Sequence, residues 1–100
     1  MSEEKLKEIK MKINPVFKKY PISFAGVFGS FARGEENTES DVDIMIKLKP
    51  QSDFSLFDLI GVETELKKTL NRDVDLATDK SIGKYIRDSV FKDLVPIYEN

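Results

Sequence analysis

Residues 26–46 read GVFGSFARGEENTESDVDIMI and join a Gly-Ser turn, Gly29-Ser30, to two aspartates one residue apart, Asp41 and Asp43. Glycine lets the backbone approach a ligand closely, and a helical turn after it offers unpaired amide hydrogens to an anion. The serine hydroxyl adds another donor, and paired carboxylates are ligands that Mg²⁺ accepts. A turn that can hold phosphate, followed by carboxylates that can hold a divalent cation, suggests work on a nucleoside triphosphate.

The two ends of this stretch predict strands. Residues 22–28 form a short run of mostly apolar, branched and aromatic side chains that Gly29 ends. Residues 41–48 alternate between polar and apolar side chains, which places Asp41 and Asp43 on one face of a strand. Their Cα atoms would then lie roughly 6.6 Å apart. That spacing suits a pair of Mg²⁺ ions about 3.5–4 Å apart, which would orient a triphosphate and neutralise its charge.

Each of these motifs also has a purely structural interpretation. A Gly-Ser pair alone is most often an ordinary turn, and a single D-x-D is most often a solvated polar face. Arg33, just after the turn, has two interpretations as well: it can bind a phosphate of the nucleotide or form a structural ion pair with an acid. A merely solvated polar face is a poor explanation for the two aspartates, because the opposite face of their strand is entirely apolar.

The rest of the chain predicts alternating helices and strands around this stretch. A helix capped by Ser2 should extend toward Tyr20, with a kink or a restart at Asn14 because Pro15 lacks an amide hydrogen. Residues 35–40 should be a polar loop. The remaining expected elements are a helix over 55–70, a strand over 73–78, a helix capped by Ser81 that runs to about 92 with Ile82, Tyr85, Ile86 and Val90 inward, and a strand over 95–98.

A third acidic residue is expected from the strand at 73–78. If that strand lies beside the one carrying the paired aspartates, the Asp75 carboxylate can complete the metal site and accept the proton of an attacking hydroxyl. Asp73 has the same parity and competes for the role. Asp75 is preferred because apolar residues flank it on both sides, whereas Asp73 stands at the strand entrance.

This order of elements predicts an α/β (α+β) fold, in which helices pack on a mixed β-sheet of about four strands. The first two strands are close enough along the chain to be antiparallel neighbours. At 100 residues the chain is expected to form one domain, 1–100, with a single main core and no separate substrate domain.

Composition narrows the possible functions. The formal net charge of −2 shows no polycation, so nucleic acid is an unlikely main partner. With no Cys and no His, catalysis must rely on carboxylates, hydroxyls, Lys, Arg or a bound ion. The N-terminus is charged, and no apolar stretch approaches the roughly 20 residues that span a bilayer. These features predict a cytoplasmic protein without a membrane partner.

Taken together, three segments resemble the signature of the minimal nucleotidyltransferases of the DNA polymerase beta-like superfamily. They are GSFARG from Gly29, SDVD from Ser40 and VDL from Val74. The resemblance implies that Gly29 and Ser30 hold the triphosphate, that Asp41 and Asp43 bind Mg²⁺, and that Asp75 completes the site. No part of the signature is missing, so the resemblance implies an active enzyme. It also implies a polymerase beta-like fold spanning nearly the whole chain.

The resemblance implies a partner too. Minimal members are often encoded beside a small helical HEPN-domain protein, as toxin–antitoxin pairs in which the transferase adds AMP to the toxin. The first hypothesis is therefore an antitoxin enzyme that moves AMP from ATP onto a hydroxyl of such a partner. The second is a non-catalytic module that neutralises its partner by docking, and a weaker third is transfer to a small molecule such as an aminoglycoside. Half a site needs its other half, from a second chain or from a homodimer.

Overall fold

The computed structural model describes residues 2–35 and 41–100, so the polar loop expected at 35–40 lies, apart from Glu35, outside the described residues. Helices and strands follow the expected order. They are α1 (Glu3–Phe17), β1 (Ile22–Phe28), α2 (Gly29–Arg33), β2 (Val42–Leu48), α3 (Leu56–Leu70), β3 (Val74–Thr78), a 3-10 turn η1 (Asp79–Ser81), α4 (Lys84–Asp93) and β4 (Val95–Glu99).

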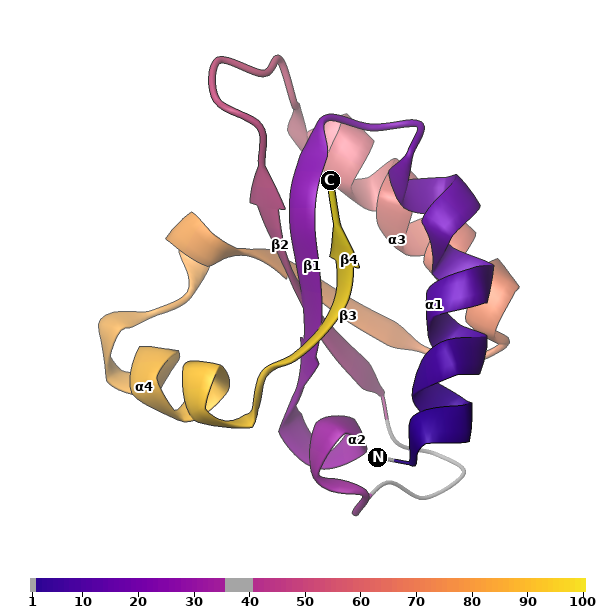
Figure 1. The fold of residues 1–100 in the computed structure, drawn as a ribbon. Helices are drawn as coiled ribbons and strands as arrows, with labels where there is room; N and C mark the ends of the chain where they lie inside the picture. The colour runs from indigo at the N-terminus through magenta and orange to yellow at the C-terminus, as the bar shows by residue number, and fades with distance from the viewer. Residues whose placement is uncertain (1, 36–40) are drawn as a thin grey trace.

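The four strands form one mixed sheet in the order β3-β2-β1-β4 (Figure 1). β1 is antiparallel to both β2 and β4, whereas β2 and β3 are parallel. A parallel pair needs a crossover connection, and α3 lies within the one that joins β2 to β3. The mixed sheet expected from the sequence is therefore confirmed, with β3 beside the strand that carries Asp43.

The main core lies between the sheet and a layer formed by α1 and α3, which share one side of the sheet in Figure 1. Its fully buried side chains come from both helices and from the central strands: Ile13, Phe17, Val27, Ile44, Ile46, Val62 and Leu66. Successive side chains of a strand point to opposite faces. Because Ile44 on β2 and Leu76 on β3 face this core, Asp43 and Asp75 point to the other face of the sheet.

α4 lies on that second face (Figure 1). Ile82 and Val90 pack there with the fully buried Met45 of β2 in a smaller core. The chain after α4 approaches β1 so closely that a Cβ at Gly26 would come within 2.6 Å of Leu94 Cδ1. Gly26 therefore provides the space in which the end of α4 sits against the sheet.

Pro15 does not divide the first helix. α1 runs unbroken through Pro15 to Phe17, so the restart at Asn14, one of the two expected alternatives, does not occur. Burial of Val16 and Phe17 against the sheet stabilises the last turn and outweighs the backbone bond that proline cannot make.

The expectation for the last helix is wrong at its start. α4 begins at Lys84 with Gly83 as its N-cap, whereas the expected cap, Ser81, belongs to η1. The Tyr85 side chain is 99% exposed and that of Ile86 is 55% exposed, so the expectation that both face inward is wrong. The helix is anchored near its C-terminal end, by Val90 and the following Leu94, and its first turn carries no buried side chain. None of the helices in the described part of the chain is long and apolar enough to cross a membrane.

Candidate functional site

Asp43 and Asp75 are direct partners in the register of the parallel strands β2 and β3. Neighbouring strands lie about 4.8 Å apart, and both side chains point to the second face of the sheet. The two carboxylates therefore emerge side by side. Asp73 precedes β3, where its backbone oxygen accepts a 2.9 Å hydrogen bond from the amide of Val42. Asp73 thus stands at the strand entrance, and Asp75 is the acid paired with Asp43.

The glycine of the Gly-Ser turn lies against the Asp43 carboxylate. Gly29 begins α2 with φ +74°, a left-handed conformation that L side chains rarely adopt. A Cβ built on it would lie 2.3 Å from Asp43 Oδ2, which is closer than atoms can approach. Phe28, just before it, pairs with Asp43 across the antiparallel β1 and β2. The register of the sheet therefore brings the turn and the aspartate together, and only glycine leaves room for both.

The electrostatics of Asp43 reflect this crowding. Partial burial raises the pKa of its carboxyl above the usual range, and the neighbouring carboxylates of Asp75 and then Asp41 raise it further. Arg33 acts in the opposite direction and lowers the pKa. A raised pKa means that the folded protein holds this proton more tightly than the unfolded chain does. Ionised Asp43 therefore destabilises the fold at neutral pH, and this cost is relieved as the pH falls through the raised pKa.

Asp43→Asn is accordingly expected to raise the melting temperature at pH 7 in a buffer with EDTA, because it removes a desolvated charge facing two other acids. The gain should shrink as the pH is lowered through the raised pKa, where the wild-type carboxyl also becomes neutral. Thermal unfolding across this pH range measures both effects. Asp88→Asn, on the exposed part of α4, is the matched control and should change little. A lower melting temperature for Asp43→Asn at pH 7 would contradict this account.

Asp41 lies just before β2 and is exposed. It is near enough to act on the pKa of Asp43. Nevertheless, among the residues that the structure describes, no three acidic, histidine or cysteine side chains are gathered into a group that could hold a metal ion. The available donors are carboxylate oxygens, which are the ligands that Mg²⁺ prefers. The like-charge repulsion on Asp43 is also the kind that a cation would relieve, so the donors fit the expected ion although the three are not gathered.

The other two predicted nucleotide-binding residues lie in α2. Ser30 follows Gly29, and its backbone oxygen accepts a 2.9 Å hydrogen bond from the amide of Glu35. Arg33 ends the helix, where its Nε and Nη1 atoms donate to carboxylates of Glu35 and Asp93. The structural ion pair, one of the two interpretations that the sequence allowed for Arg33, is therefore present. It does not use all five N–H donors of the guanidinium, so a phosphate contact remains chemically available.

Asp93 is a neighbour of this site that the sequence analysis did not identify. Its Oδ2 atom lies 2.8 Å from Arg33 Nη1, although sixty residues separate the two along the chain. One signal could have found it. An acidic residue at the C-terminus of a helix opposes the helix dipole, so Asp93 at the end of α4 calls for a cationic partner elsewhere in the fold.

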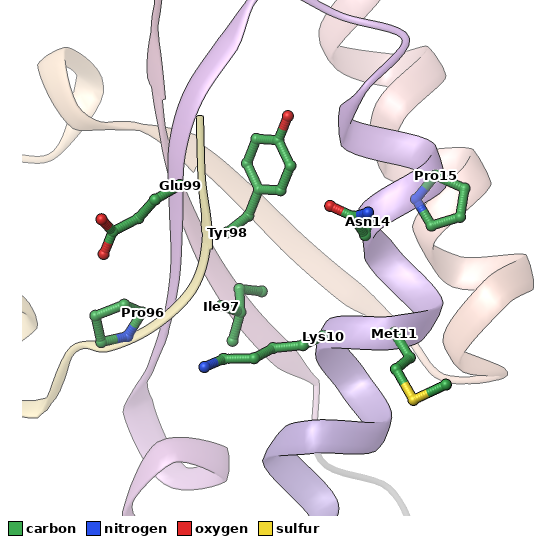
Figure 2. A pocket seen from close by; sticks show the side chains of 8 residues that line it. All are labelled: Lys10, Met11, Asn14, Pro15, Pro96, Ile97, Tyr98 and Glu99. Atoms are coloured by element: carbon green, nitrogen blue, oxygen red, sulfur yellow. The ribbon is translucent and has the colours of Figure 1, made fainter.

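A separate hollow lies away from these residues, between α1 and the edge strand β4, as Figure 2 shows. It measures about 580 Å³, and the Lys10 side chain extends from α1 toward β4 across it. Its lining contains none of the predicted site residues. α1 covers the opposite face of the sheet from Asp43, so this hollow has no geometric connection to the paired aspartates.

Sequence comparison identifies relatives of this chain. The family model described as "Polymerase beta, Nucleotidyltransferase" matches residues 11–100. A protein of Methanocaldococcus jannaschii, provisionally named a protein adenylyltransferase, is 35% identical over 92% of this chain and 97% of its own length. The match therefore covers nearly the whole of both proteins.

Solved structures show the same fold. One, provisionally identified as a minimal nucleotidyltransferase, has a TM-score of 0.78 and 24% identity, with 96% of each chain covered. A second is a chain from the structure of a tri-AMPylated Shewanella oneidensis HEPN toxin in complex with an MNT antitoxin. Its TM-score is 0.71 at 16% identity, over 95% of this chain and 73% of that one. At these identities the likeness establishes the four-stranded nucleotidyltransferase architecture.

Proposed function

This chain belongs to the polymerase beta nucleotidyltransferase family, and from that premise we propose that it transfers AMP from ATP to a hydroxyl group of a partner protein in a Mg²⁺-dependent reaction. The observation that carries the proposal is the packing of Gly29 against Asp43, with Asp75 paired beside it. A phosphate-binding turn and two carboxylates from neighbouring strands then share one face of the sheet.

The proposed roles follow from these positions. The backbone of Gly29 and the hydroxyl of Ser30 hold the β- and γ-phosphates, and Arg33 adds a cation to the same side. Asp41, Asp43 and Asp75 provide the oxygen ligands for Mg²⁺, with two ions proposed. When bound, Mg²⁺ supplies charge neutralisation for the triphosphate.

Asp75 also accepts the proton of the attacking hydroxyl. The hydroxyl oxygen of the partner forms a bond to the α-phosphorus, and the bond from that phosphorus to the oxygen bridging to the β-phosphate breaks. The hydroxyl hydrogen goes to the Asp75 carboxylate, and pyrophosphate leaves. Asp75 suits this role because β3 holds it directly beside Asp43 while its side chain stays exposed to an incoming protein.

The proposed partner is a HEPN-domain toxin, with this chain as its antitoxin. The support is the similarity to an adenylyltransferase relative and to a chain from a complex that contains a tri-AMPylated HEPN toxin. We propose that this partner presents the acceptor hydroxyl to the face of the sheet that carries Asp43 and Asp75.

Intact-mass spectrometry of a HEPN-domain protein incubated with this chain tests the proposal. After incubation with this chain, Mg²⁺ and each ribonucleoside triphosphate in turn, we expect the mass to rise by one or more AMP units with ATP alone. The size of the mass increase gives the number of AMP groups added to each partner molecule. The Asp41→Asn/Asp43→Asn double variant should give no increase, and an increase with another triphosphate would overturn the choice of ATP.

The second candidate is a module that neutralises the partner by docking. It is favoured by the finding that, within the described residues, no three acids are gathered as a metal-binding group. Docking predicts that the double variant still suppresses the toxin and that the mass of the partner never changes. A stable complex without any mass increase would therefore move the assignment from enzyme to binding module.

A further inference from the structure

The short helix α2, which begins with the Gly-Ser turn, contacts other elements through both of its end residues. The first, Gly29, lies against the Asp43 carboxylate. At its last residue, Arg33 donates from Nη1 to Asp93 Oδ2 over 2.8 Å, which joins α2 to the end of α4. Phe31 and Ala32 between them are buried in the main core. Asp93 is thus the only residue of α4 bonded to Arg33 among the described contacts.

The backbone next to Asp93 is held by packing against β1. The residue after it, Leu94, lies against Gly26 of β1, where a Cβ on the glycine would come within 2.6 Å. Gly26 is three residues before Gly29 on the same segment of the chain. The end of α4 is therefore seated on the strand that leads into the turn, so the position of Asp93 relative to Arg33 follows from the packing of the sheet.

Arg33 has a second acidic partner, and exposure separates the two. The Glu35 side chain is 63% exposed, whereas that of Asp93 is 22% exposed. Solvent screens the exposed pair more strongly, and ordering the longer Glu35 side chain costs more conformational freedom. Asp93 is therefore the partner that holds the guanidinium in one orientation.

We propose that Asp93 is a positioning residue for the nucleotide: it holds the Arg33 guanidinium against α4, so that the remaining N–H donors face the phosphates bound at the Gly-Ser turn. This inference deepens the proposed function and rests on the nucleotide site described there. An arginine that is already oriented loses less rotamer freedom when a phosphate binds. The acid does not touch the nucleotide, and it acts only through Arg33.

Asp93→Asn is expected to raise the Kd for Mg²⁺-AMP-PNP about fivefold to tenfold, which corresponds to the freedom of one long side chain. Isothermal titration with the complete chain measures this without any acceptor protein. Asp93→Glu keeps the carboxylate and should stay within about threefold of wild type. Asp88→Asn, the same change five residues earlier on α4, should leave the Kd unchanged.

An Arg33→Ala background separates positioning from a general loss of structure. If Asp93 acts through Arg33, Asp93→Asn adds nothing to the Kd of Arg33→Ala, because coupled residues are not additive. An equal effect in both backgrounds, or an Asp93→Asn Kd within twofold of wild type, would overturn the inference. If the wild-type chain does not bind Mg²⁺-AMP-PNP, both the proposed function and the role of Asp93 are wrong. If the wild-type chain binds it and Asp93→Asn binds it equally well, only the role of Asp93 is wrong.

Discussion

Replacing Asp43 with asparagine is expected to lower the rate of AMP transfer by about 10³-fold or more. Asparagine preserves the size of the side chain but removes the negative charge that would hold Mg²⁺ beside the triphosphate. Phosphoryl transfer is accelerated mainly by positioning and charge stabilisation, so loss of that charge removes most of the rate enhancement. Single-turnover transfer of labelled AMP to the partner, at saturating Mg²⁺ and ATP, measures the change.

The neighbouring strand provides a control for this experiment. Asp75→Asn should show a similarly large loss, because Asp75 is the residue paired with Asp43. Asp73→Asn should retain most of the activity, since Asp73 stands at the strand entrance, where its backbone pairs with Val42. Near wild-type transfer by Asp43→Asn would contradict the assigned site, and a larger loss for Asp73→Asn than for Asp75→Asn would exchange the roles of those two acids.

The effects of Asp43→Asn on rate and on stability are expected to have opposite signs. The substitution should remove activity while raising the melting temperature at neutral pH, because burial and the neighbouring acids raise the pKa of Asp43. A side chain that lowers stability and is needed for activity is typical of a functional site. A variant that is both more stable and fully active would show that Asp43 is not needed for activity.

Gly29→Ala is expected to lower AMP transfer by about 10²-fold or more and to destabilise the fold by roughly 1–3 kcal/mol. The methyl group would lie 2.3 Å from Asp43 Oδ2, and alanine would have to adopt φ +74°. Either the turn or the aspartate must move, and both hold reacting groups in the proposed site. Chemical denaturation measures the free energy of unfolding, and the labelled-AMP assay measures the rate.

Gly83→Ala is the matched control for this substitution. Gly83 has φ −62° before α4, and a Cβ built there would meet no atom within 4 Å. Its free energy of unfolding should change by less than about 1 kcal/mol, because the poorer N-cap and the smaller freedom of the unfolded chain act in opposite directions. Equal effects of the two glycine substitutions, or an active and stable Gly29→Ala protein, would contradict the close approach between the turn and Asp43.

Local features of the fold were predictable from the sequence because they depend on short-range periodicity. The alternation after Asp41 predicted a strand, and β2 confirms it over Val42–Leu48, with Asp41 just before its first residue. Turn residues and helical spacing predicted the order of the elements, and the short connection between the first two strands allowed the antiparallel pairing that β1 and β2 have. The structure departs from local sequence preference where tertiary packing overrides it. Burial holds α1 together through Pro15, and the anchoring of α4 near its C-terminal end leaves Tyr85 exposed.

By itself, the sequence determined which residue types were available and where along the chain they stand: a Gly-Ser turn, two aspartates one residue apart and a third in a later strand. Only the tertiary structure decided which of them meet. The parallel register places Asp75 rather than Asp73 beside Asp43, and the β1–β2 register brings Gly29 against that carboxylate. The Arg33–Asp93 ion pair also depends on the tertiary structure, because sixty residues separate its two partners along the chain. Such contacts follow from strand pairing and helix packing between distant segments, which no local pattern of residues encodes.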